Sequence, residues 1–408
     1  MLAVQTIYLP HLHSVAVALA LRGGPRYEGD GEGGLTHFLE HMLFRGAGPR
    51  SMRELMAAFE EVGGEPDAYT SEDALVLHLE EVAPARLERA CELLASVLCA
   101  PRYEDLEAER EVVREELLDR AHELDDLERS AAFSGHPLAR SILGTRADLA
   151  RRSVDDLEGW RRQIVRSGNT ALVVAGPVPP ERVRAAVAPL EALPEGPALA
   201  ERRPLTLPAG PSWRSRREPG ERAELRLSFR CPGDAEEGAA ATRVLADLLD
   251  GGPTSRVPQE LVDAGLAYDA GTSLLSLPDA GLLALEVACA GSKLSAAARA
   301  LLGVAEALRT GVDPAELARA RLRREHRRRR LLDDAPSQAE WTVRRLLFGL
   351  PAEREAALDA EDAVDPDRLV DLARELFRRE RLTAVLLGDP PRGEARRLRQ
   401  RLAAWSPP

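Results

Sequence analysis

Two segments of this 408-residue chain share one pattern at an offset of 212 residues, and this internal repeat sets the strongest limit on its fold. Residues 169–176 (NTALVVAG) are a short, β-branched run followed by prolines and a helix-like stretch. Residues 381–388 (RLTAVLLG) are followed by prolines and another helix-like stretch. Both predict a strand, a Gly/Pro turn and a helix. A period of this length indicates a duplicated domain rather than a short solenoid repeat.

The beginnings of the two halves match as well. Residues 13–22 (HSVAVALALR) read as an apolar strand ending in Gly-Gly-Pro, and residues 224–230 (ELRLSFR) alternate and end in Cys-Pro-Gly. Residues 196–222 are rich in Pro, Gly and Arg without periodicity, which is typical of a linker. We predict an α+β fold of two structurally similar αβ domains, 1–195 and 223–408, related by duplication. Each would be an antiparallel sheet with helices packed on one face.

The charge is unevenly distributed between the halves. Apolar residues make up 44% and charged residues 30% of the chain, which excludes a wholly disordered protein. Residues 1–200 carry 34 acidic against 21 basic residues, a net −13, and residues 201–408 carry 33 against 34, a net +1. An acidic chain is a poor nucleic-acid binder. For the basic run Arg321–Arg330 we therefore favour a solvated helix face over a nucleic-acid patch.

The cysteines and the apolar runs bear on the compartment. Four scattered cysteines without a CxxC pair exclude a disulfide framework and argue against a thiolate zinc site. They indicate reduced thiols in a cytoplasmic protein. The apolar run Val15–Leu21 is too short for a transmembrane helix and lacks signal-peptide flanks. We therefore predict a cytoplasmic location and no membrane segment.

Residues 33–44 (GGLTHFLEHMLF) combine helix-breaking glycines with a helix that carries two histidines. His37 and His41 are four residues apart, so both imidazoles project from one helical face, where two neutral nitrogens can bind one Zn²⁺. Glu40 can reach a water at such a metal without ligating it. This His-x-x-Glu-His order is the inverzincin signature. The alternative is two surface histidines beside a solvated glutamate, and a third ligand would favour the metal.

A catalytic zinc site has three protein ligands and one open position. Residues 104–123 predict one long helix, and its apolar stripe consists of Val112, Val113, Leu117 and Leu118. Several glutamates lie on this helix. Spacing alone does not choose among the four candidates for the third ligand, which are Glu109, Glu111, Glu115 and Glu116.

The stretch 33–55 (GGLTHFLEHMLFRGAGPRSMREL) resembles the pitrilysin-type zinc peptidases, the inverzincin family of insulin-degrading enzyme and mitochondrial processing peptidase. In that family a helix of the form Glu-Arg-x-Val-Val-x-Glu-Glu follows later in the chain, and residues 109–116 here read EREVVREE. Further matches are 63–70 (GGEPDAYT), 136–140 (HPLAR) and 265–268 (GLAY). The resemblance thus extends over much of the chain.

The resemblance implies roles for the polar residues of both motifs. It makes Glu116 the third ligand of one Zn²⁺ per chain, beside His37 and His41. It makes Glu109 a residue that orients or polarises the site. Zinc so held would lower the pKa of a water and polarise the scissile carbonyl. Glu40 would take the water proton as general base and pass it to the leaving amine.

The resemblance also implies where a peptide binds. It would lie extended along a sheet edge at Asp67, Ala68 and Tyr69, pairing through its backbone, and Tyr268 of the second half would contact the substrate carbonyl. Two positions depart from the family pattern. Asp67 stands where the family often has asparagine, so an amide donor is lost. Leu261 stands where active members have an arginine seven residues before the tyrosine.

We predict from these observations a zinc metalloendopeptidase that hydrolyses peptides or unfolded segments, working as a homodimer or as a heterodimer with a related subunit. The acidic catalytic half favours basic peptides as substrates. Because Leu261 replaces the arginine, one alternative is the zinc-bearing subunit of a heterodimeric peptidase whose partner supplies the Arg/Tyr contacts. Another is a non-catalytic peptide-binding scaffold that keeps zinc. We predict neither nucleic acid nor membrane as a partner.

Overall fold

The chain forms two compact units. The computed structural model describes every residue except 119–122, 202–204, 206–209 and 407–408. Unit 1 comprises Met1–Arg120, Gly135–Leu205 and Arg330–Arg354, and unit 2 comprises Ala121–Ser134, Thr206–Arg329 and Glu355–Pro408. Each unit therefore contains a segment that is remote in sequence from the rest of it.

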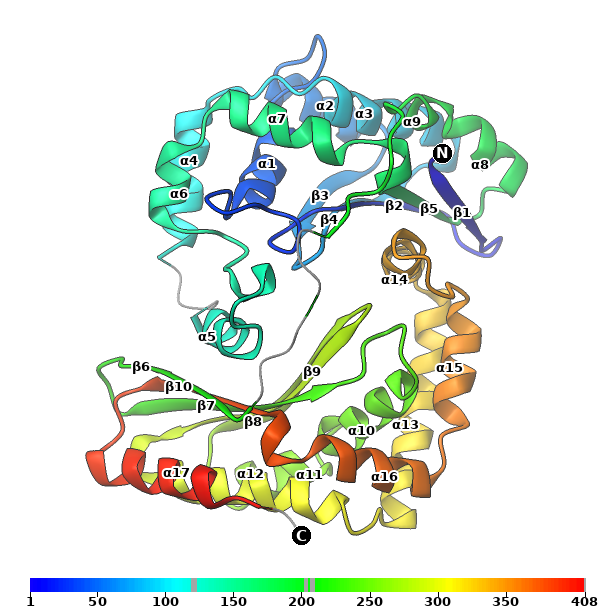
Figure 1. Cartoon of the computed structure of the whole chain (residues 1–408). Coiled ribbons are helices and arrows are strands. Elements are labelled where there is room, and N and C mark those ends of the chain that lie inside the picture. The colour runs from blue at the N-terminus through cyan, green and yellow to red at the C-terminus, as the bar shows by residue number, and fades with distance from the viewer. Residues whose placement is uncertain (119–122, 202–204, 206–209, 407–408) are drawn as a thin grey trace. The chain divides into compact units, whose positions relative to one another are not determined.

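Unit 1 is built on a five-stranded sheet, sheet 1, in the order β1-β5-β2-β4-β3 (Figure 1). Its strands are β1 (Ala3–Tyr8), β2 (Val15–Arg22), β3 (Glu65–Thr70), β4 (Ala74–Val82) and β5 (Thr170–Gly176). β1 pairs parallel to β5 and the other pairs are antiparallel, so the sheet is mixed rather than wholly antiparallel as predicted. Its helices are α1 (Leu35–Leu43), α2 (Met52–Glu61), α3 (Leu87–Cys99), α4 (Leu106–Glu116), α6 (Arg146–Arg151), α7 (Val154–Ile164), α8 (Pro180–Ala186), α9 (Ala188–Glu191) and α14 (Ala335–Leu347).

Unit 2 repeats this design with sheet 2, in the order β6-β10-β7-β9-β8. Its strands are β6 (Ser212–Arg216), β7 (Arg222–Cys231), β8 (Asp269–Leu277), β9 (Ala280–Ala290) and β10 (Leu382–Gly388). Its helices are α5 (Glu123–Ala132), α10 (Ala239–Asp250), α11 (Arg256–Pro258), α12 (Leu294–Leu308), most of α13 (Pro314–Asp333), α15 (Arg354–Asp362), α16 (Pro366–Leu376) and α17 (Arg392–Ala404). The strand order is that of sheet 1 with each number raised by five, which confirms two similar αβ domains.

The central strand β2 shows why helices cover both faces of sheet 1. Its residues Val15–Leu21 are all buried, because each face of the sheet is apolar. The inner face packs against the main helices of unit 1. The outer face consists of small residues on β2 and β5, and α14 covers it (Figure 1). The predicted helices on one face are thus joined by one helix on the other, since an uncovered alanine and valine surface would be costly in water.

Sheet 2 has a covering helix of the same kind. The helix α5 contacts β10, β6 and β7. It is fixed there by Arg226 of β7, whose Nη1 donates to Asp125 at 2.6 Å and to Glu128 at 2.8 Å. The two halves of the sequence therefore exchange helices, because α5 of the first half lies on sheet 2 and α14 of the second half lies on sheet 1.

The segment 196–222, predicted as a linker, contributes an edge strand. β6 lies within it and pairs parallel to β10, and Trp213 packs against the core of unit 2. A five-residue strand with one apolar residue leaves too weak a period to be recognised in the sequence. Parts of this segment, 202–204 and 206–209, lie outside the described residues. The domain bounds themselves stay a prediction.

The helix predicted over 104–123 is shorter in the structure. α4 ends at Glu116, residues 119–122 lie outside the described part of the chain, and α5 begins at Glu123. Two residues of the predicted apolar stripe are exposed, Val112 by 44% and Leu118 by 51%. The buried face of α4 instead consists of Glu109 and Val113, one helical turn apart, because a glutamate takes a place in the interior.

Two further sequence expectations concern whole-chain properties. No helix within the described residues is both long and apolar enough to cross a bilayer. The four cysteines are free thiols, and Cys99 at the end of α3 is exposed whereas the other three are buried.

Candidate metal centre

Gly34 and Glu28 fix the start of the helix α1. Gly34 has φ 74°, and a Cβ there would lie 2.4 Å from the carbonyl oxygen of Leu143, so only glycine fits. The fully buried Glu28 caps the first turn: its carboxylate accepts from the N–H of Gly34 at 3.1 Å and from the N–H and hydroxyl of Thr36 at 2.8 Å each. These contacts satisfy N–H groups that a helix start leaves without partners.

The sequence of α1 separates an apolar face from a polar one. Five apolar residues are buried in the core of unit 1: Leu35, Phe38, Leu39, Met42 and Leu43. The rest of the helix presents His37, Glu40 and His41 together. The two imidazole rings lie edge to face with centroids 4.6 Å apart.

The last residue of α4 completes a set of three donors. Oε2 of Glu116 lies 3.5 Å from Nε2 of His37 and 3.5 Å from Nε2 of His41. In tetrahedral zinc, ligands at about 2.0–2.1 Å from the metal are about 3.3 Å from one another. The donor types and these two separations fit zinc, and all three donor atoms lie within 4.8 Å of one another. Within the described residues, this is the only group of three or more His, Cys, Asp or Glu side chains that could hold a metal ion.

Glu109 lies behind one of these donors. Its Oε1 is 2.8 Å from Nδ1 of His41, and its other oxygen forms an ion pair with Arg45. The carboxylate is buried within α4 one helical turn before Val113. A carboxylate on Nδ1 fixes the ring so that Nε2 presents its lone pair to a metal, which is the usual second contact of a metal-binding histidine.

Glu40 faces the same centre and is bonded to the sheet. The hydroxyl of Thr70, the last residue of β3, donates to Oε2 of Glu40 at 2.6 Å. Burial raises the pKa of Glu40 to about 7, with Glu116 and Asp67 adding to the rise and with the Thr70 bond and His41 opposing it. A cation on the three donors would favour the carboxylate form.

The predicted peptide-binding residues lie on β3, which ends the order of sheet 1. Ala68 packs against the inner core, whereas Tyr69 packs on the outer face, as strand alternation requires. The Asp67 carboxylate accepts from the N–H of Ala68 at 2.8 Å and lies 3.4 Å from Nε2 of His78. The structure thus places these residues on a sheet edge next to Thr70.

Tyr268 belongs to unit 2 and is 56% exposed. The guanidinium of Arg222 lies 5.0 Å from the centroid of its ring, within cation–π range. Leu261, which replaces the family arginine, is fully buried in the core. Arg256 is engaged elsewhere, since two of its nitrogens donate to Glu316 at 2.8 Å. The role of Tyr268 stays a prediction.

Three residues of this site escaped the sequence reasoning: Glu28, Arg45 and Thr70. A signal existed for two of them. Arg45 follows His41 by one helical turn, so it projects from the same side of the chain. Thr70 follows Ala68 by two residues, so it shares that residue's face of the strand. Glu28 lies in a loop, where no period applies.

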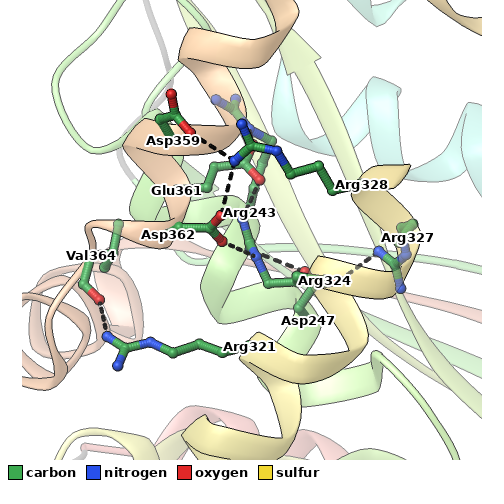
Figure 2. A network of polar contacts seen from close by, with 10 residues as sticks. All are labelled: Arg243, Asp247, Arg321, Arg324, Arg327, Arg328, Asp359, Glu361, Asp362 and Val364. Atoms are coloured by element: carbon green, nitrogen blue, oxygen red, sulfur yellow. Dashed lines mark hydrogen bonds and ion pairs between the residues drawn. The ribbon is translucent and has the colours of Figure 1, made fainter. Parts of the chain in front are cut away.

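The basic run of α13 is held by acidic residues (Figure 2). Arg324 is buried and donates to Asp247 of α10 at 3.1 Å, and Arg327 donates to the same carboxylate at 3.0 Å. Arg328 donates to Asp359 of α15 at 2.6 Å. The prediction of a solvated face was therefore wrong for Arg324, and these guanidinium groups bind three helices of unit 2 together.

Comparison with protein families assigns the chain. Residues 3–146 match the model of insulinase, peptidase family M16, and residues 152–323 match that of the peptidase M16 inactive domain. The chain belongs to peptidase family M16. The His-x-x-Glu-His motif and Glu116 fall within the first match.

Individual M16 relatives agree with this assignment. The chain is 30% identical over 188 residues to an uncharacterized zinc protease of Rickettsia felis, covering 45% of each. It is 28% identical over 176 residues to a probable mitochondrial-processing peptidase subunit beta of Arabidopsis thaliana, covering 42% of this chain and 33% of that one. These matches span less than half of either relative's length. The crystal structure of a protease from Helicobacter pylori has the same fold, with a TM-score of 0.88 at 21% identity over 95% of this chain and 96% of that one.

Proposed function

We propose that this M16 member is a zinc-dependent metalloendopeptidase that hydrolyses peptides or unfolded segments. One observation carries the proposal: His37, His41 and Glu116 meet at zinc-ligand separations, with Glu40 alongside. The zinc-protease names of its relatives support it. One zinc per chain is part of the proposal.

The mechanism follows from what each side chain can do. Zinc, when bound, supplies Lewis acidity that acidifies water and polarises a carbonyl. Glu40 accepts the proton of the attacking water and returns it to the leaving amine. The hydroxyl of Thr70 donates to Oε2 of Glu40 and thereby orients the carboxylate, whose Oε1 has no part in this bond and can accept the proton. Glu109 accepts a hydrogen bond from the protonated Nδ1 of His41, so that the lone pair of Nε2 stays available to bind the metal.

The substrate would add to the free edge of sheet 1 along β3. Backbone pairing at a sheet edge gives affinity for an extended peptide with little regard to its sequence. Asp67 and Glu80 are exposed near this edge, with 73% and 51% of their side chains accessible, so the local charge favours basic peptides. Matched basic and acidic peptides, cleaved at low and high salt, test this point, and equal rates at low salt would contradict it.

The proposal is tested on the purified chain by metal analysis and peptide cleavage. We expect about one zinc per chain, activity that a chelator removes and zinc restores, and a Glu40→Gln variant that keeps zinc without cleaving. Cleavage by Glu40→Gln at the wild-type rate would show that another group is the base.

A second candidate is the zinc-bearing subunit of a heterodimeric peptidase. The buried Leu261 in place of arginine and the similarity to a processing-peptidase subunit beta favour it. It predicts zinc and peptide binding in a single chain with little turnover, and turnover on adding a related subunit. Activity measured beside the oligomeric mass separates it from a self-sufficient homodimer. Stoichiometric zinc with peptide binding and no turnover in any assembly would indicate a scaffold. A cytoplasmic location stays a prediction.

A further inference from the structure

The helix α14 contacts the predicted catalytic region through sheet 1. Its residues Ala335, Ala339, Val343 and Leu347 recur every fourth position and pack on the alanines and valines of the outer face. On the same helix, Glu340 and Arg344 are one turn apart. Both reach the hairpin formed by β3 and β4.

The two polar side chains of α14 hold residues on both sides of Thr70. The Tyr69 hydroxyl donates to Oε1 of Glu340 at 2.7 Å. Arg344 donates to Oγ of Ser71 at 2.8 Å and to Oδ1 of Asp73, a fully buried carboxylate, at 2.9 Å. The residues before and after Thr70 are therefore both bonded to α14.

Thr70 points the other way. Side chains alternate along a strand, so when Tyr69 faces α14, Thr70 faces α1 on the inner side of the sheet. There its hydroxyl donates to Glu40 at 2.6 Å. The backbone at residues 69–71 thus connects α14 on one face of the sheet to Glu40 on the other.

We propose that Glu340 and Arg344 are positioning residues for Glu40, acting through the hairpin turn and the Thr70 hydroxyl. The proposal rests on the function proposed for Glu40. Anchoring both neighbours of Thr70 fixes its backbone, and the direction of its hydroxyl follows. A carboxylate that must lie within hydrogen-bond reach of a reacting water loses rate when its support shifts by about an ångström.

The first experiment compares single variants of the full, zinc-loaded chain. Tyr69→Phe and Glu340→Ala each remove one partner of the same bond and should lower kcat about fivefold, with KM and zinc content unchanged. Glu340→Gln keeps an acceptor oxygen and should restore kcat to within about twofold of wild type. Arg344→Gln removes the guanidinium that donates to both Ser71 and Asp73, so it should lower kcat in the same way.

The second experiment asks whether the effect passes through Thr70. Thr70→Val should lower kcat about tenfold, and adding Glu340→Ala to it should cost nothing more. Arg354→Ala is the matched control, because Arg354 donates to the Ser337 carbonyl at 2.6 Å and stacks on Trp341, both on α14. It should lower the unfolding temperature and leave kcat unchanged.

The outcomes separate this proposal from the peptidase itself. Wild-type kcat in Glu340→Ala and Tyr69→Phe, an effect confined to KM, or full additivity with Thr70→Val would overturn it. If the wild-type chain has no zinc-dependent cleavage, the peptidase proposal fails. Positioning is then decided by the crystal structure and amide exchange of Glu340→Ala: faster exchange over residues 69–74 with Thr70 displaced from Glu40 supports it, and unchanged geometry overturns it.

Discussion

In each unit, the helix that follows the second strand starts after a glycine with positive φ, but the residues on the two helices differ in chemical character. α1 starts at Gly34 with φ 74° and α10 starts at Gly238 with φ 101°. With these caps aligned, the polar residues that α1 contributes to the candidate metal centre, which are His37, Glu40 and His41, correspond to Ala241, Val244 and Leu245 of α10. The three residues of α10 are buried in the core of unit 2. The fold therefore does not depend on the polar residues of the metal centre.

The neighbouring helices differ in the same manner. In unit 1, α4 brings Glu109 and Glu116 to the histidines of α1. In unit 2, α13 brings Arg324 and Arg327 to Asp247 of α10 (Figure 2). The pair α1 and α4 brings together histidines and a glutamate that could all bind one cation. The pair α10 and α13 instead joins a carboxylate to arginines. A cation site requires donors whose charge the protein leaves uncompensated, and unit 2 compensates its own.

The largest expected effect comes from giving α1 the residues of α10. The variant His37→Ala, Glu40→Val, His41→Leu should lose zinc and at least about a thousandfold of the peptidase activity. Its metal-free unfolding free energy should stay within roughly 1 kcal/mol of wild type, because unit 2 packs such residues at these places. Zinc analysis, cleavage assays and urea unfolding measure this. A metal-free variant that is unfolded in buffer would break the comparison.

The reverse change, which gives α10 a polar residue of α1, should destabilise the protein without creating a metal site. Val244→Glu places a carboxylate at a residue that is only 3% exposed and should destabilise the chain by about 4 kcal/mol. Ala240→Glu, at a half-buried position on the same helix, is the control and should cost far less. Chemical denaturation measures both. Equal losses in the two variants would show that burial on α10 is not the cause.

Removing Arg324, the central arginine of the unit 2 network, should lower the free energy of unfolding by about 3 kcal/mol. Arg324→Ala removes the buried guanidinium that Asp247 and Glu361 share, and these carboxylates keep only the more exposed Arg327 and Arg243 as partners. The exposed Arg329, 3.4 Å from Glu325, is the control, and Arg329→Ala should change stability by less than about 0.5 kcal/mol. Thermal unfolding of the two variants distinguishes them, and an unaffected Arg324→Ala would reduce the network to surface pairs.

The acid that caps α1 should make unit 1 sensitive to pH. Burial raises the pKa of Glu28 from 4.5 to about 7, against the bonds from Thr36 and Gly34. The folded state then binds the proton more tightly, so this contribution to stability is fully present below about pH 4.5 and is lost as pH rises through about 7.

The test of this pH dependence uses the metal-free protein and Glu28→Gln, which cannot ionise. Between pH 5 and pH 8 the unfolding free energy of wild type should fall by about 3 kcal/mol relative to that variant. Urea unfolding at several pH values gives the difference. A difference that does not vary with pH would mean that Glu28 is charged throughout.

The smallest expected effect, on zinc affinity, comes from changing Glu109, which contacts the proposed ligand His41. Glu109→Gln weakens the contact to His41 and should reduce zinc affinity about tenfold while leaving one zinc per chain at saturation. Glu111→Gln is the control on the same helix, since Glu111 is 57% exposed and pairs with Arg114. Competition with a zinc chelator measures both affinities. If the two variants match, Glu109 contributes no more than an ordinary surface charge.

The sequence revealed the parts of the site that depend on local periodicity. His37, Glu40 and His41 lie on one helix, so a 3.6-residue repeat is enough to bring them together. Glu116 was reached through family resemblance, because spacing left four glutamates open. Periodicity places Thr70 on the same strand face as Ala68, but its bond to Glu40 could not be predicted, since that bond depends on the pairing of β3 and on the position of α1 over the sheet.

The exchange of helices was likewise beyond the sequence. The four-residue repeat of Ala335, Ala339, Val343 and Leu347 predicts an amphipathic helix, but such a face fits any apolar sheet of small residues. The choice between sheets is made by polar contacts such as Arg344 to Asp73, which join residues 271 positions apart. A pattern read along the chain carries no information on such a partner.

The placement of α14 has a consequence for biosynthesis. The last strand of sheet 1 to be synthesised ends at Gly176, whereas the helix that covers the outer face of the sheet begins only at Ala335. The apolar outer face of sheet 1 must wait for it, and so must the anchors on either side of Thr70. Unit 1 is then completed only after α14 has been made, which under the proposed function would delay peptidase activity until that point of translation. Protease resistance of nascent chains stalled before Ala335, and far enough beyond Leu347 for α14 to have left the ribosome, would measure this order of events.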